Sequence, residues 1–420
     1  MELNANQQRA IDLAVAGKNL FITGSGGVGK SVVINELSRR FSKSAVLLAP
    51  TGIAALNIGG ATLHRTFGLP FSICHEDDYA PFGNTKDLFE DDTIQTIIID
   101  EISMVRADSF ITIDQKLRRA KGYLDLPFGG LQVIVVGDFF QLPPVLTRDE
   151  EEEAYFELFD SMYCFNTDTW VDLDLEIVNL EQVMRQGDEN TVRALNAIRR
   201  GKSSRSILNW LNKQCIETEV SEDAVTLCTR NADAQEINDM FYLEIDSPEK
   251  TFYAKVEGNF NDKPVEKFLK LKVGCRVILC ANNNTNGYSN GQSGYVTDFV
   301  YGDEPYITVE LDCGSVVKVE PHVWESISYK VKSRRLIKTV NGSFKQFPIK
   351  LGYGITIHKS QGMTLDECIL DLGQGAFSHG QTYVGLSRIR SLDTMLLERP
   401  IYANDIIVDQ EVINFYDHLG

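Results

Sequence analysis

The chain has 420 residues and a formal net charge of −18 at pH 7, with 43% hydrophobic and 24% charged residues. This composition is typical of a globular protein of two or three domains, and it excludes disordered and collagen-like chains. The acidity excludes a protein held to nucleic acid by its overall charge. Because there is no secretory signal and no apolar run long enough to cross a bilayer, we expect a protein of a bacterial or phage-like cytoplasm with no membrane partner.

The charge is unevenly distributed along the chain. Residues 70–180 contain 24 acidic and 7 basic residues, a net charge of −17, whereas residues 330–400 contain 11 basic and 5 acidic residues, a net charge of +6. The simplest explanation of the negative charge of residues 70–180 is that these side chains lie on surfaces that face solvent. The basic segment indicates a local cationic surface on an acidic protein.

Short apolar runs and amphipathic segments alternate in the first 140 residues. Residues 7–15 and 31–41 predict helices, and residues 20–22, 45–48, 96–99 and 132–136 predict buried parallel strands. The last two strands are followed by carboxylates, Asp100 and Asp138. Since α/β sheets bind ligands at the carboxyl ends of parallel strands, we expect a site at this edge.

A second α/β set follows, with strands at 225–229, 276–280, 367–371 and 394–397 and helices at 232–243 and 380–387. Within it, residues 290–350 alternate in polarity and are punctuated by glycines, which predicts a small antiparallel barrel. Residues 70–95 form a polar interruption of the first set. We therefore expect an α/β protein of two domains, 1–175 with an insertion at 70–95 and 176–420 with an insertion at 290–350.

The sequence GSGGVGKS fits the phosphate-binding pattern GxxxxGK[ST] between a predicted strand and a predicted helix. Its backbone amides would surround phosphate oxygens, Lys30 would contact the β and γ phosphates of ATP, and Ser31 would offer a hydroxyl to Mg²⁺. The loop residues are Gly24, Ser25, Gly26, Gly27, Val28, Gly29, Lys30 and Ser31.

Further polar residues suit nucleotide hydrolysis. Asp100 is placed to hold the Mg²⁺ shell opposite Ser31, and Glu101 to orient and deprotonate the attacking water. Gln141, in GDFFQLPPV, would contact the γ-phosphate or that water. Arg185 and Arg388 would stabilise transition-state charge, although each taken singly suits a surface salt bridge better.

Taken in order, these motifs resemble those of superfamily 1B DNA helicases of the PIF-one type, within the RecD-like group. The resemblance rests on LNANQQRAI, GSGGVGKS, APTGIAALNIGGATLHRTFGL, IIIDEISM, FGGLQVIVVGDFFQLPPV, VMRQ, GYGITIHKSQGMTLDE and YVGLSRIRS. It implies two RecA-like lobes, a wedge insertion in the first and an SH3-like barrel in the second. The activity implied is ATP-driven 5′-to-3′ translocation on single-stranded DNA with duplex unwinding.

By the same resemblance, Gln7 would read adenine and Gly362 would belong to the ATP site. The motif-matched DNA contacts are Thr51, Gly52, Thr62, His64, Thr356, His358, Lys359 and Ser360. Hydroxyls and amides suit the weak phosphate contacts that a stepping motor needs. His64, Phe67 and His358 are candidates for stacking on bases, although a core position suits Phe67 better and the histidines could be structural. Phe71, Tyr79 and Phe82 would form a duplex-splitting wedge or anchor an ordinary loop.

The expected partners are single-stranded DNA and tailed or forked duplex DNA, with replication, repair or recombination proteins, and the expected oligomeric state is a monomer. Two alternatives stay open from the residues. One is a DNA-stimulated P-loop ATPase or translocase that does not separate strands. The other is a DNA-binding module with an inactive ATPase, against which the complete set of Lys30, Asp100, Glu101, Gln141 and Arg388 argues.

Overall fold

The computed structural model of the chain describes most of its residues. The described ranges are 3–70, 72–81, 83–90, 92–146, 149–181, 189–216, 218–221, 224–260, 264–283, 285–302, 304–332 and 335–419. The chain folds into two compact units. The first comprises Met1–Met184, Glu325–Asn341 and Glu411–Gly420, and the second comprises Arg185–Trp324 and Gly342–Gln410.

A six-stranded sheet forms the centre of the first unit, with the order β3-β2-β4-β5-β1-β6 and parallel pairing throughout. The predicted strands are confirmed as β1 (Leu20–Thr23), β2 (Ala45–Ala49), β4 (Thr96–Ile99) and β5 (Gln132–Gly137), and two short strands, β3 (Ala61–Thr62) and β6 (Glu176–Asn179), lie at the edges. The four predicted strands are almost entirely buried, which explains their continuous apolar sequences.

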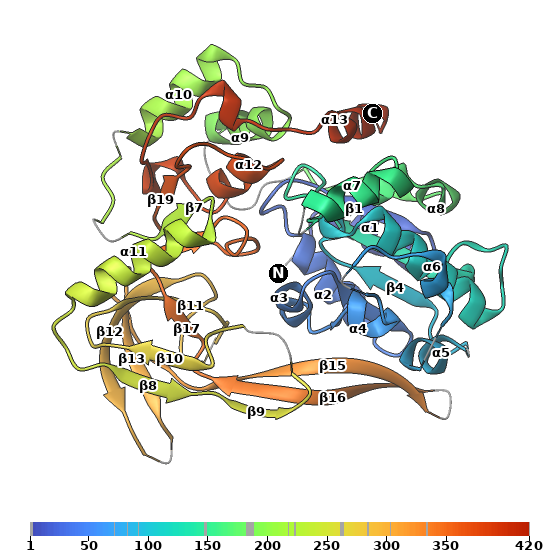
Figure 1. Cartoon of the computed structure of the whole chain (residues 1–420), viewed down its shortest axis with the longest axis horizontal. Coiled ribbons are helices and arrows are strands. Elements are labelled where there is room, and N and C mark those ends of the chain that lie inside the picture. The colour runs from blue at the N-terminus through green and yellow to red at the C-terminus, as the bar shows by residue number, and fades with distance from the viewer. Residues whose placement is uncertain are drawn as a thin grey trace. The chain divides into compact units, whose positions relative to one another are not determined.

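Helices α1 (Ala5–Val15) and α2 (Lys30–Arg40) pack beside this sheet (Figure 1). Their apolar stripes, which include Ile11 and Ile34, join Ile22, Ile98 and Ile134 of the sheet in one buried cluster. The remaining helices of this unit are α3 (Gly52–Asn57), α4 (Leu63–Phe67), α5 (Asn84–Phe89), α6 (Ala107–Lys121), α7 (Asp149–Leu158), α8 (Asp168–Asp172) and α13 (Gln410–His418), with 3-10 turns η1 (Glu76–Tyr79), η2 (Ile102–Met104), η3 (Pro127–Gly130) and η4 (Cys164–Asn166).

The first unit draws on three separate stretches of sequence. β6 pairs with β1 beyond the predicted boundary at residue 175, so the first sheet continues past that point. Residues 325–341, from the neighbouring strands β15 (His322–Lys332) and β16 (Arg335–Gln346), also belong here. The backbone N–H of Leu47 donates to the Tyr329 hydroxyl at 3.4 Å, and the Arg65 guanidinium donates to the Ser326 hydroxyl. These contacts join residues more than 250 positions apart.

The second unit has its own parallel sheet of four strands in the order β18-β7-β19-β20. The strands are β7 (Thr226–Cys228), β18 (Gly354–Thr356), β19 (Cys368–Asp371) and β20 (Met395–Leu397). The helices are α9 (Glu189–Arg199), α10 (Arg205–Ile216), α11 (Asn231–Glu244) and α12 (Gln381–Leu386), with turns η5 (Leu392–Thr394) and η6 (Ala403–Asp405). The predicted strands at 225–229, 367–371 and 394–397 are confirmed.

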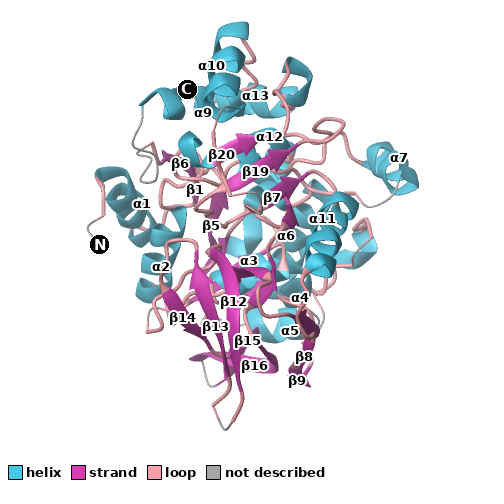
Figure 2. Cartoon of the chain, turned by 90° about the vertical axis from the view of Figure 1, so that its left-hand side faces the viewer, coloured by secondary structure: helices cyan, strands magenta, loops and turns pink. Residues whose placement is uncertain are grey.

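An antiparallel part completes the second unit. Its largest sheet has the order β14-β13-β12-β11-β17, and β12, β13 and β14 lie side by side (Figure 2). The strands are β8 (Lys250–Tyr253), β9 (Lys255–Gly258), β10 (Phe268–Leu271), β11 (Arg276–Leu279), β12 (Ser293–Val300), β13 (Tyr306–Leu311), β14 (Val316–Val319) and β17 (Ile349–Leu351). Its buried apolar residues form a second core, which includes Val277, Val296 and Val309.

One strand belongs to a different sheet from the one predicted. Residues 276–280 were expected in the parallel core, but β11 pairs antiparallel with β12 and β17. Its buried residues Val277, Ile278 and Leu279 are apolar on both faces of the strand, and such a short run does not distinguish a parallel strand from the centre of an antiparallel sheet. Among the residues that the structure describes, no helix is long and apolar enough to cross a membrane.

Candidate nucleotide and DNA site

The glycine-rich loop connects β1 to α2 at the carboxyl edge of the first sheet. Gly24, Gly27 and Gly29 have positive φ angles of 147°, 83° and 87°, and a Cβ atom on Gly24 would come within 2.5 Å of the Leu180 carbonyl oxygen. The loop therefore needs glycine both for its backbone conformation and for close packing. It delivers the chain to the N-terminus of α2, and the positive end of a helix dipole favours an anion.

Lys30 is the first residue of α2, and its side chain folds back over the loop. Its Nζ donates to the carbonyl oxygens of Gly24 at 2.7 Å and Ser25 at 3.1 Å. The ammonium group is thus held above the loop by bonds that phosphate oxygens would replace. Ser31 follows it and is exposed.

Asp100 and Glu101 leave the end of β4 at the same edge of the sheet. Burial, followed by the neighbouring Glu101 carboxylate, raises the pKa of Asp100 to about 7, and the nearby charge of Lys30 lowers it. Glu101 has a φ of 51°, a left-handed conformation that costs a non-glycine residue about 1–3 kcal/mol and that is found often at functional sites. The predicted acidic pair therefore lies close to the predicted phosphate loop.

Gln141 and Asp138 follow β5, the strand between β4 and β1. Both side chains are buried, and the Gln141 N–H donates to the Asp138 carbonyl oxygen at 2.9 Å in a tight turn. The Asp138 carboxylate accepts from the Phe140 N–H at 3.2 Å. The loop that carries Gln141 thus emerges directly beside the strand that leads into the phosphate loop.

Gln7 connects the start of α1 to the same loop. Its Oε1 accepts from the Asn4 N–H at 3.0 Å in a capping box, and its Nε2 donates to the Val28 carbonyl oxygen at 3.3 Å. The side chain is buried. Reading adenine would require Gln7 to exchange at least one of these bonds.

Thr51 and Thr62 each cap a short helix in the first unit. The Thr51 hydroxyl accepts from the Ala54 N–H at 3.2 Å at the start of α3, where Gly52 is the first residue, and the Thr62 hydroxyl accepts from the Arg65 N–H at 3.3 Å at the start of α4. These hydroxyls shape the two turns. The predicted DNA-contacting residues Thr51, Gly52 and Thr62 are thus at helix starts and half-buried.

His64 and Phe67 lie one turn apart on α4 but differ in exposure. His64 is half-buried, and burial lowers the pKa of its imidazole. Phe67 is 1% exposed and stacks on Phe89 at a centroid distance of 5.6 Å. The prediction that Phe67 stacks on DNA bases is therefore wrong, because its ring belongs to the core between α4 and α5.

The aromatic residues proposed as a wedge are only partly described. Tyr79 is half-buried, and the Arg119 guanidinium lies 5.3 Å from its ring centroid, so Tyr79 anchors η1 to α6. Phe71 and Phe82 lie outside the described residues.

The sequence Thr356–Ser360 forms a turn after β18 in the second unit. The Thr356 hydroxyl accepts from the Lys359 N–H at 3.3 Å, and the Ser360 hydroxyl donates to the Ile357 carbonyl oxygen at 2.8 Å. Both side chains are buried, so their hydroxyls shape the turn, whereas Lys359 is exposed and His358 is half-buried with a pKa lowered by burial. The turn thus presents His358 and Lys359, and Gly362 follows at a φ of 80°.

Arg388 lies directly after α12 and is 3% exposed. Its guanidinium donates to the carbonyl oxygens of Val384 at 2.8 Å, Ser360 at 3.2 Å and Met363 at 3.4 Å, and to the Ser387 hydroxyl at 2.7 Å. These bonds connect Arg388 to the turn that carries His358 and Lys359. Arg185, the other predicted arginine, lies outside the described residues.

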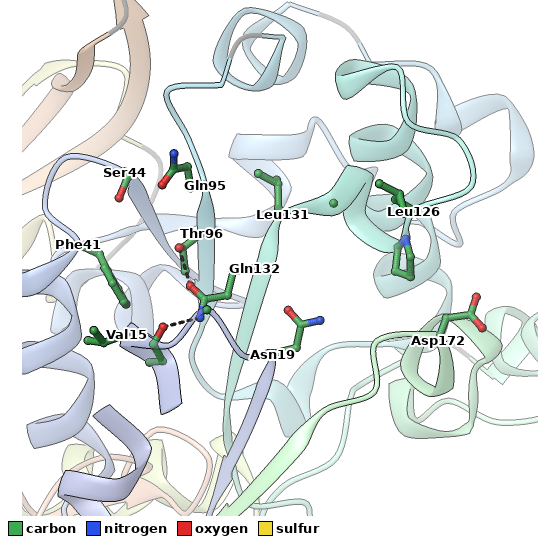
Figure 3. A pocket seen from close by; sticks show the side chains of 14 residues that line it. Val15, Asn19, Phe41, Ser44, Gln95, Thr96, Leu126, Leu131, Gln132 and Asp172 are labelled. Carbon is green, nitrogen blue, oxygen red and sulfur yellow. Dashed lines mark hydrogen bonds between the residues drawn. The ribbon is translucent and has the colours of Figure 1, made fainter. Parts of the chain in front are cut away.

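A cavity of about 460 Å³ lies at the opposite edge of the first sheet, where the strands begin (Figure 3). Gln132 crosses it: its amide donates to the Ala14 carbonyl oxygen at 2.7 Å, and its Oε1 accepts from the Thr96 hydroxyl at 2.8 Å. Asp172 is the one acidic or basic side chain among the described lining residues. This cavity is therefore separate from the phosphate loop and lacks its charged groups.

Sequence reasoning missed one side chain at the carboxyl edge. The Tyr416 hydroxyl, near the end of the chain, lies 2.7 Å from the Thr23 hydroxyl, directly before the phosphate loop. Nothing in the sequence pairs these two residues, because 393 positions separate them and Tyr416 belongs to no recognised motif.

Known proteins resemble this chain along its whole length. Residues 2–214 match the family model of the PIF1-like helicases. The ATP-dependent DNA helicase Pif1 of Campylobacter jejuni is 31% identical, over 97% of this chain and 96% of that protein. Two crystal structures of Bacteroides Pif1 match over 100% of this chain and 97% of the crystallised chain. The complex with ADP-AlF4 has a TM-score of 0.90 at 34% identity, and the form bound to ssDNA has a TM-score of 0.71 at 35% identity.

These similarities confirm the predicted fold class of two RecA-like lobes with a small insertion in the first and an SH3-like barrel in the second. They also explain why the phosphate loop, the acidic pair and the motifs of the second unit occur together. The chain belongs to the PIF1-like helicase family, and with it to the ATP-dependent DNA helicases.

Proposed function

We propose that this helicase couples ATP hydrolysis to 5′-to-3′ translocation on single-stranded DNA, and that it thereby unwinds tailed or forked duplex DNA. The observation that carries the proposal is the grouping of Lys30, Asp100 and Glu101 beside the glycine loop, close enough for the Lys30 charge to act on the Asp100 carboxyl. The direction of translocation rests on the resemblance of the motifs to superfamily 1B.

In the proposed binding mode, the amides of residues 24–31 surround the phosphates. Lys30 exchanges its bonds to Gly24 and Ser25 for β- and γ-phosphate oxygens, which its position above the loop favours. Gln7 reads the adenine, since its side chain already contacts the loop at Val28. Gly362 contributes to the same nucleotide site.

Ser31 and Asp100 would hold Mg²⁺, Asp100 through a water molecule. Burial and the neighbouring Glu101 carboxylate both disfavour the ionised form of Asp100, so a nearby cation would stabilise it. The Ser31 hydroxyl and the Asp100 carboxylate both offer oxygen ligands, which magnesium prefers. Among the described residues, no group of three or more His, Cys, Asp or Glu side chains could hold a metal ion. A site of one or two protein ligands completed by phosphate and water agrees with that finding. When bound, the ion would neutralise phosphate charge.

Hydrolysis in this proposal depends on four further residues. Glu101 orients and deprotonates the attacking water, and Gln141 contacts the γ-phosphate or that water. Arg185 and Arg388 stabilise the charge of the transition state. For Arg388 this role requires an exchange of its present bonds to Ser360 and Met363, so its action would be coupled to the turn that presents His358.

DNA binding is proposed to use weak, exchangeable contacts. His64 and His358 stack on bases, Lys359 pairs with a phosphate, and the turns capped by Thr51 and Thr62 offer Gly52 and neighbouring amides to the backbone. Thr356 and Ser360 contribute by holding the shape of their turn. This pattern suits a motor, because each phosphate contact must be released at every step.

We further propose that the protein acts as a monomer in a bacterial or phage-like cytoplasm, with replication, repair or recombination proteins as partners. The first test of the proposed function is ATP turnover with and without single-stranded DNA. Turnover stimulated by DNA supports it, and turnover indifferent to DNA would contradict it.

A further inference from the structure

The last helix of the chain, α13, contributes to the edge of the first sheet that carries the phosphate loop. Residues 411–420 belong to the first unit, although the residues before them, 342–410, belong to the second. Tyr416 is 8% exposed, and its hydroxyl lies beside Thr23, the last residue of β1, and Phe139, which follows β5. No motif used to infer the activity includes this helix.

The Tyr416 hydroxyl contacts Thr23, Phe139 and Asp138. It lies 2.7 Å from the Thr23 hydroxyl, accepts from the Phe139 N–H at 3.2 Å, and donates to Asp138 Oδ1 at 3.5 Å. If the Thr23 hydroxyl donates, these three hydrogen bonds use the one donor and both acceptor positions of the Tyr416 phenol. The ring stacks on Phe140 at a centroid distance of 4.6 Å.

These partners flank the two catalytic loops. Thr23 directly precedes Gly24, the first residue of the phosphate loop, and Phe139 lies two residues before Gln141. The parallel pairing of β1 with β5 ends at Thr23 and Gly137, so the strand ladder no longer fixes the distance between the two chains beyond that point. Tyr416 supplies a bridge where the ladder stops.

Neighbouring residues hold α13 in place. The Phe415 ring lies 4.2 Å from Phe165 and 5.5 Å from Phe139, centroid to centroid. The Glu411 carboxylate accepts from the Ser161 hydroxyl at 2.5 Å and from the Asn166 amide. Because packing and hydrogen bonds both anchor the helix, the Tyr416 hydroxyl is well placed to restrain its partners.

We infer that Tyr416 is a positioning residue for ATP hydrolysis: its hydroxyl fixes the phosphate loop relative to the loop that carries Gln141. The inference rests on the proposed function, in which both loops contact the nucleotide. Catalysis is sensitive to such positioning, because a displacement of about 1 Å can cost on the order of 100-fold in rate. Tyr416 itself is not proposed to touch ATP.

The test replaces Tyr416 with phenylalanine in the full chain, which removes the hydroxyl and keeps the ring stacked on Phe140. We expect the DNA-stimulated kcat to fall about 10-fold and the Tm to fall slightly, because buried hydrogen bonds are lost. The KM for ATP and the affinity for single-stranded DNA should stay within error of the unsubstituted protein. Thr23→Val removes the partner hydroxyl and should lower kcat by a similar factor. The double variant should lose little more than either single variant, because both remove the same bridge.

Tyr155→Phe is the matched control, since it removes another buried tyrosine hydroxyl of the first unit, which donates to the Ser161 carbonyl oxygen at 3.3 Å, outside both loops. It should lower the Tm and leave kcat unchanged. An unchanged kcat in Tyr416→Phe, or an equal loss of kcat in Tyr155→Phe, would overturn the inference. Full turnover in Lys30→Ala would instead contradict the proposed nucleotide site, so the two failures are distinguishable.

Discussion

Nζ of Lys30 donates a 2.7 Å hydrogen bond to the carbonyl oxygen of Gly24, the residue at which the phosphate loop begins. The lysine is therefore held over its own loop by backbone atoms that phosphate would displace. We predict that Lys30→Ala reduces DNA-stimulated ATP turnover by at least about 100-fold, the usual effect of removing one preorganised charge from a reacting group. Steady-state phosphate release measures this directly. Turnover near that of the unsubstituted protein would remove Lys30 from the site.

Glu101 offers a separate test of the chemistry. Replacement by glutamine keeps the size of the side chain and removes the base, so kcat should fall by about 10² to 10⁴-fold. Nucleotide binding should persist, because Lys30 and the loop amides are untouched. The change also removes the negative charge that raises the pKa of Asp100, so the carboxylate of Asp100 should form at lower pH. Binding of a fluorescent ATP analogue together with single-turnover hydrolysis separates these effects; loss of binding would contradict the assignment of Glu101 as the base.

The half-buried histidines should govern DNA affinity. His64→Ala and His358→Ala should each weaken binding to single-stranded DNA by about 1–3 kcal/mol, the range for loss of one stacked base, and leave the DNA-free ATPase nearly intact. Phe67→Leu is the control, since Phe67 is buried and its replacement should lower stability without changing affinity. Fluorescence titration gives the comparison. Equal affinity in all variants would exclude both histidines from the DNA path.

The same histidines set the expected pH dependence of binding. Burial lowers the pKa of both from the usual 6.5, so both imidazoles are neutral at pH 7 and above. We therefore expect the affinity for single-stranded DNA to be nearly constant between pH 7 and 8. A steep fall over that interval would indicate that a protonated histidine pairs with phosphate.

Arg276 is the most deeply buried cation among the described residues of the second unit, at 0% exposure. It pairs with Asp312 through bonds of 2.8 Å and 3.1 Å and lies 3.5 Å from a Glu367 carboxylate oxygen. Arg276→Met leaves these carboxylates without their cation and should cost about 3–5 kcal/mol of unfolding free energy. Urea unfolding measures the loss, and Arg276→Met with Asp312→Leu should recover part of it. Arg39→Met, which breaks the 2.7 Å ion pair of the exposed Arg39 with Glu36, is the control. A destabilisation by Arg276→Met as small as that of the control would contradict the role of Arg276.

Local sequence predicted much of this molecule. The phosphate loop, the helix after it and the acidic ends of β4 and β5 follow from patterns within a few residues, because glycine spacing and buried strands have local causes. The stacking partner of Phe67 could not be predicted in this way, since Phe89 lies 22 positions later in an insertion. The sheet to which Arg276–Leu279 belongs likewise depends on distant strands.

The longest-range features were invisible to the sequence motifs. Tyr416 approaches Thr23 only because the chain returns to the first unit after residue 410, and Arg388 donates to the Ser360 carbonyl only because α12 packs near that turn. Tertiary folding decides both contacts, and neither residue carries a local signal for its partner. Such contacts determine how the predicted catalytic residues are held.

We predict that ATP hydrolysis by this helicase drives unwinding in the 5′-to-3′ direction. Release of a labelled strand from duplexes that differ only in carrying a 5′ or a 3′ single-stranded tail tests it most directly, with Lys30→Ala as the inactive control. We predict ATP-dependent release from the 5′-tailed duplex, little release from the 3′-tailed duplex and none with Lys30→Ala. Preferential release from the 3′-tailed duplex, or DNA-stimulated turnover without release from either, would contradict the claim.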